Sequence, residues 1–64
     1  MDIQRANEIQ EILAKYFGDY HKSRLIPYTV ANLRDNDLAQ LSTATGISET
    51  ELREYPKVWM ANKD

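Results

Sequence analysis

Residues 38 to 52 place a helix stop directly before a helix start, and this pattern constrains the fold more than any other feature of the chain. Leu38 and Leu41 stand at helical spacing ahead of Gly46, and the run from Ser48 to Glu51 follows at once. Glycine readily takes the left-handed conformation that ends many helices. Serine followed three residues later by glutamate is a capping box, in which each side chain bonds the other residue's backbone N–H. We therefore predict two helices joined by a tight corner.

The longest predicted helix covers residues 3 to 20. At about 100° per residue, one side of this segment is apolar and the other is polar, as in a helix that packs on a core. Asp2 is the predicted N-cap, and Gly18 marks an end or a fraying point. The apolar side consists of Ile3, Ala6, Ile9, Leu13, Tyr16, Phe17 and Tyr20, with Ile12 at its edge.

The connection from residue 18 to residue 31 is predicted to be mostly irregular. Pro27 disfavours a helical conformation for Ile26, so we expect no helix to run through this point. A short helical turn from Thr29 to Leu33 is expected instead. The apolar residues of the connection are expected to lie across the core, namely Leu25, Ile26, Tyr28 and Val30.

Two further helices are predicted after this connection. Asp35 or Asn36 can cap the first of them, and Ser48 caps the second. Pro56 lacks a backbone N–H, so the second helix is expected to stop at Tyr55 or to kink there. A last turn over residues 57 to 60 would then restart with Pro56 as its first helical residue.

Composition favours a purely helical domain. The chain has 64 residues, with two glycines, two prolines and no cysteine. So few turn-forming residues argue against an all-β fold, and a chain without cysteine has neither a disulfide framework nor a thiolate metal site. We predict a single all-α domain over residues 1–64: a compact three-helix domain with a helix-turn-helix-like corner and a short C-terminal turn.

Residues 35 to 57 resemble the helix-turn-helix superfamily. Leu41 matches the buried residue of the first helix, Ser42 the small residue where the helices approach, and Gly46-Ile47-Ser48 the common turn. The run from Leu52 to Lys57 is similar to the end of the reading helix in tetracycline-repressor-type domains. The resemblance implies a second helix that lies in the DNA major groove.

The charges and one turn residue depart from that family. The net charge is −2, and from Ser48 to Lys57 there are three acids and two bases, whereas DNA-reading surfaces are usually basic. Thr45 stands where the family has an apolar residue. Glu49 and Glu54 would face the phosphates and repel them.

The leading hypothesis is therefore a small non-enzymatic regulatory protein that binds another protein. Its acidic balance suits a basic partner surface, as expected of an inhibitor or adaptor of a nucleic-acid-handling protein, with phages or mobile elements as conceivable sources. Tyr, Trp and Met are enriched in interface cores, which makes the C-terminal apolar residues candidate anchors. Trp59 has an alternative role, closing the bottom of the bundle. The predicted partner-binding residues are Glu49, Arg53, Glu54, Tyr55, Lys57, Trp59 and Met60.

The alternative hypothesis is a small helix-turn-helix transcriptional regulator that binds DNA as a homodimer. Arginine and lysine bind phosphate or guanine, and hydroxyl groups bond phosphate oxygens. The predicted DNA-binding residues are Ser48, Thr50, Arg53, Lys57, Lys22 and Arg24.

Other kinds of site have little support in the sequence. His21 is the single histidine and stands in the predicted connection, where a solvated role is more common than catalysis. The chain has no metal-ligand spacing, P-loop or dinucleotide motif, so we expect no catalytic residues, no metal and no cofactor. No segment has the roughly 20 consecutive apolar residues of a membrane span, and a cytoplasmic location is expected.

Overall fold

Four α-helices and one short 3-10 helix make up the part of the chain that the computed structural model describes, residues 1–18 and 23–62. This confirms the all-α class, although with four α-helices where three were predicted. The described residues contain no strand. In chain order the elements are α1 (Ile3–Phe17), η1 (Ser23–Leu25), α2 (Ile26–Ala31), α3 (Asp35–Thr45) and α4 (Glu49–Ala61).

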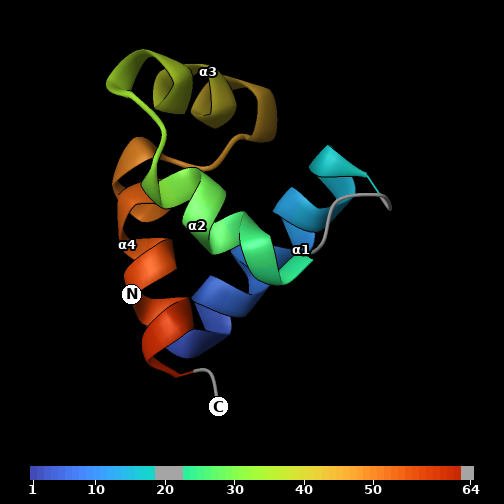
Figure 1. Ribbon diagram of the computed structural model, residues 1–64, viewed down its shortest axis with the longest axis vertical. Coiled ribbons are helices and arrows are strands. Elements are labelled where there is room, and N and C mark those ends of the chain that lie inside the picture. The colour runs from blue at the N-terminus through green and yellow to red at the C-terminus, as the bar shows by residue number, and fades with distance from the viewer. Residues whose placement is uncertain (19–22, 63–64) are drawn as a thin grey trace.

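The helices surround one apolar core. Helix α2 lies in the middle of the molecule, packed against α1 and α4, while α3 crosses the top and turns back into α4 (Figure 1). Helix α4 packs on all three other α-helices, so it holds the fold together. The buried apolar residues come from every α-helix and from the corner: Ala6, Ile9, Leu13, Ile26, Val30, Leu38, Leu41, Ile47, Leu52 and Tyr55.

Helix α1 begins where the sequence predicts and ends at Phe17, with Gly18 as its C-cap. The Asp2 side chain accepts a hydrogen bond from the backbone N–H of Arg5 at 2.9 Å, as an N-cap should. Gly18 has a φ of 90°, and its N–H donates to the Ala14 carbonyl. Tyr20, predicted at the helix end, lies outside the described residues.

The apolar side of α1 is narrower than predicted. Its central residues, Ala6, Ile9 and Leu13, are fully buried. Ile3, the first residue of the predicted stripe, and Tyr16, in the last turn of α1, are 38% and 53% exposed. A short domain offers too little facing surface to cover the ends of a helix of this length.

The expectation that no helix passes Pro27 is wrong. Helix α2 begins at Ile26, which is helical and buried, and it ends at Ala31 rather than continuing to Leu33. Proline fits here because the first N–H groups of a helix have no partner within it and its fixed φ suits a first turn. Leu25 and Tyr28, expected across the core, are 45% and 48% exposed.

Of the two outcomes expected at Pro56, the stop at Tyr55 is wrong. Helix α4 continues through Pro56 to Ala61, so the C-terminal turn is its last turn and not a separate one. Proline removes the N–H that would bond the Leu52 carbonyl. The helix persists because the Pro56 ring is itself buried beside Leu52 and Tyr55, so tertiary packing holds the segment where local propensity opposes it.

Candidate partner-binding surface

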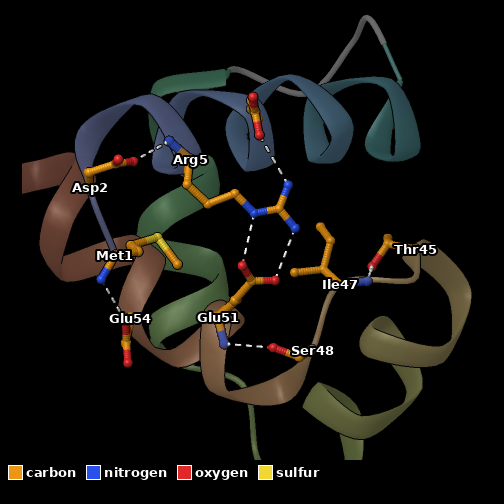
Figure 2. A network of polar contacts seen from close by, with 9 residues as sticks. Met1, Asp2, Arg5, Thr45, Ile47, Ser48, Glu51 and Glu54 are labelled. Atoms are coloured by element: carbon orange, nitrogen blue, oxygen red, sulfur yellow. Dashed lines mark hydrogen bonds and ion pairs between the residues drawn. The ribbon is translucent and has the colours of Figure 1, made fainter.

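The corner between α3 and α4 has the predicted geometry. Gly46 has a φ of 77°, in the left-handed region, and its N–H donates to the Ser42 carbonyl at 2.8 Å. The Ser48 side chain accepts from the Glu51 N–H at 3.1 Å (Figure 2). The start of α3 differs from the prediction, since Asp35 is its first helical residue and Arg34 precedes it without a side-chain cap.

Thr45 has a role in this corner that explains why it is polar. Its hydroxyl donates to the Leu41 carbonyl at 2.8 Å and accepts from the Ile47 N–H at 3.3 Å. The Ser42 hydroxyl donates to the Ile47 carbonyl. Two side chains of α3 thus hold the backbone of Ile47, whose own side chain is 1% exposed and belongs to the core. An apolar residue at position 45 could not make these bonds.

An ion-pair network joins the start of α4 to α1. Arg5 Nε and Nη2 donate to the two carboxylate oxygens of Glu51, each at 2.9 Å, and Nη1 donates to Glu8 at 3.2 Å (Figure 2). The Arg5 guanidinium lowers the pKa of Glu51, and bonds from the Ser48 backbone N–H and hydroxyl lower it further. Glu51 therefore serves the capping box and an interhelical bridge together. The sequence predicts only the first role.

The outward face of α4 carries both signs of charge. Thr50, Arg53, Glu54 and Lys57 are all exposed along it. The Arg53 guanidinium lies 3.0 Å from the Asp35 carboxylate and 3.9 Å from that of Glu49. The Met1 amino group donates to Glu54 at 3.0 Å (Figure 2). Lys57 makes no ion pair with any described residue.

The three predicted apolar anchors have different surroundings. Tyr55 is 0% exposed, and its hydroxyl donates to Gln10 Oε1 on α1. Burial raises the pKa of this phenol above its ordinary value. Tyr55 is therefore a core residue that no partner can touch in this fold. Trp59 packs against the core while partly exposed, and Met60 is partly exposed at the edge of a groove.

That groove lies where α2, α3 and α4 meet and has a volume of about 300 Å³. Arg53, Lys57 and Met60 line it from α4, and Ala31 and Leu33 line it from the end of α2 and the residues after it. The sequence predicts Arg53, Lys57 and Met60 as partner-binding residues, but neither the buried α4 members of the groove, Leu52 and Pro56, nor its α2 side. Only the packing of α2 on α4 brings the two segments together.

The predicted DNA-binding residues are not equally available. The Ser48 hydroxyl is used as a helix cap, and Arg53 is close to two carboxylates. Thr50, Lys57 and Arg24 are exposed. Lys22 lies outside the described residues, as does His21.

Comparisons with protein-family models, curated proteins and solved structures gave no match for this chain. The helix-turn-helix resemblance over residues 35 to 57 therefore remains a prediction. Within residues 1–18 and 23–62, no helix has the length and apolar character that crossing a membrane requires. The same residues hold no cluster of three or more His, Cys, Asp or Glu side chains placed for a metal ion.

Proposed function

We propose that this protein is a small non-enzymatic regulator that acts by binding another protein through the outward face of α4. One observation carries the proposal: charges of both signs lie on this face directly beside a groove with apolar walls. Protein interfaces combine apolar contact in the middle with a polar rim in this way. An inhibitor or adaptor needs no more than such a surface.

The internal pairing of Arg53 supports a protein partner over DNA. A guanidinium that reads guanine or grips phosphate needs its donors free. Here Arg53 Nη2 lies 3.0 Å from the Asp35 carboxylate and 3.9 Å from that of Glu49, so this donor is already engaged. Glu54, paired with the Met1 amino group, lies on the same face. Phosphates brought to Arg53 would meet two carboxylates beside its guanidinium, those of Asp35 and Glu49. The partner surface that fits best has charges of both signs, with basic groups facing the start of α4.

Site-specific photo-crosslinking tests the proposal. Thr50 is exposed on the face of α4 and its side chain has no bond in the described structure, so Thr50→p-benzoylphenylalanine leaves the fold intact. The matched control is Glu11→p-benzoylphenylalanine, on the exposed side of α1. Irradiation in the source cells should give one discrete protein adduct from position 50 and not from position 11. Adducts that are the same at both positions, or none at all, would refute the proposal.

A duplex-binding titration separates the DNA alternative. Binding of a labelled mixed-sequence duplex is measured at several salt concentrations. A groove reader must lose affinity steeply as salt rises, with a slope of about −0.9 per neutralised phosphate. We expect no measurable binding even at low salt. Tight binding with a steep slope, lost in Lys57→Ala and kept in Lys15→Ala, would instead identify α4 as a DNA-reading helix.

A further inference from the structure

The groove between α2 and α4 combines an apolar lining with a cationic edge. Arg53 and Lys57 are its charged members, and no acidic residue among those described lines it. Its volume of about 300 Å³ is at the lower end of the range for ligand sites, which suits a single side chain. Ala31 belongs to the apolar lining, together with Val30, Leu33, Leu38, Leu52, Pro56 and Met60.

The two cations of the groove are not equivalent. The Arg53 guanidinium is already compensated by Asp35 at 3.0 Å. The Lys57 ammonium has no carboxylate partner among the described residues. A carboxylate arriving at the groove can therefore pair with Lys57 without displacing an internal contact.

We propose that the groove accepts one large apolar side chain of the partner protein, with a carboxylate of the same partner segment paired to Lys57. This inference rests on the proposed function and specifies the chemistry of the partner. Leu33 and Met60, both partly exposed, are the lining residues that an entering side chain covers. The unbranched thioether of Met60 can adjust to the shape of the occupant.

An NMR titration with two matched probes tests the chemistry directly. N-acetyl-L-phenylalanine carries an aromatic ring and a carboxylate, and N-acetyl-L-phenylalaninamide has the same shape without the charge. Added to the 15N-labelled full chain, the acid should shift the amide signals of Ala31, Leu33, Lys57 and Met60. A dissociation constant in the millimolar range is expected for probes of this size. The amide should bind about threefold more weakly, since an exposed ion pair contributes modestly.

Two variants assign the charge preference to one residue. Lys57→Ala should abolish the preference for the acid over the amide. Lys15→Ala, which removes an exposed cation from α1, should retain it. Signal shifts scattered over the surface, or equal binding of the two probes to the wild-type chain, would overturn the inference.

The failures of the two proposals are distinguishable. A protein adduct from position 50 without any response of the groove residues to the probes would overturn the groove inference alone. Localised binding of the acid without any adduct from position 50 would overturn the proposed function, while the chemistry of the groove would stand.

Discussion

Glu54 and Tyr55 are neighbours in the sequence, but Glu54 lies on the exposed face of α4 and Tyr55 on its buried face. Tyr55 is 0% exposed, bonded to Gln10, and packed in the core with Leu52. Glu54 is exposed, and its ion-pair partner among residues 1–18 and 23–62 is the Met1 amino group. The inner face is therefore held by many contacts at once, whereas the outer face is exposed. One helix thus carries both the stability of the fold and the surface proposed for its function.

Tyr55→Ala is the strongest test of the difference between the inner and outer faces of α4. Removing a fully buried aromatic ring should lower the free energy of unfolding by about 3–5 kcal/mol. A domain this small has little more than that to lose. Urea denaturation followed by circular dichroism would show it.

Tyr55→Phe is the matched control. It keeps the ring and loses only the hydroxyl bond to Gln10, so a loss of about 1 kcal/mol is expected. Should Tyr55→Ala unfold within about 1 kcal/mol of the wild type, the inner face would not be the core that the burial indicates.

A second variant tests the α3–α4 turn at Gly46, which sets the direction of α4 and of its outer face. Gly46→Ala should cost about 1 kcal/mol, since its φ of 77° is unfavourable for residues with a Cβ. No atom lies within 4 Å of the added Cβ, so the cost is conformational and not steric. Thermal unfolding would measure it. Gly46→Asn should lose less, because asparagine tolerates this conformation, and an equal loss in both variants would point to another cause.

A smaller effect on stability is expected when the Arg5–Glu51 ion pair between α1 and α4 is removed. Arg5 and Ser48 hold the pKa of Glu51 below its ordinary 4.5, so its contribution to stability is present above pH 4.5. That contribution is lost as the pH falls through the lowered pKa of the folded state. Urea midpoints measured from pH 6 downwards should therefore fall less in Glu51→Gln than in the wild type. Parallel curves for the two proteins would mean that the bridge contributes nothing.

The smallest change in the free energy of unfolding is expected for a substitution on the outer face itself. Lys57→Ala should change the free energy of unfolding by less than about 0.5 kcal/mol, because Lys57 is exposed and has no ion-pair partner among the described residues. The same urea denaturation would measure it. A loss comparable to that of Gly46→Ala would show that Lys57 holds the fold together and is not reserved for a partner.

The sequence predicts correctly the features whose hydrogen bonds close within a few residues. Asp2 caps α1, Gly46 ends α3, and Ser48 caps α4 through the N–H of Glu51. Each of these bonds joins groups at most four residues apart, so its partner is visible in the local pattern. The all-α class follows from the same signals together with the apolar spacing of α1.

The same local signals mislead at the two prolines. Pro27 lies in the first turn of α2, and Pro56 lies inside α4. The expectation that proline interrupts a helix considers the missing N–H but not the burial of the proline ring. Both proline rings are buried here. The prediction of Tyr55 as a partner-binding residue fails for a related reason, since it is fully buried. Its spacing indicates an apolar face without saying whether another helix covers that face.

By itself, then, the chain determined where α1 and α4 begin, where α3 ends and where the α3–α4 corner falls. The tertiary structure decided which charged side chains form ion pairs within the fold and which do not. Arg5 pairs with Glu51 across a separation of 46 residues, and Arg53 pairs with Asp35 across a separation of 18 residues. The groove beside Lys57 exists only because α2 packs on α4. Capping energies depend on neighbours along the chain, whereas pairing and burial depend on distances that only the folded chain sets.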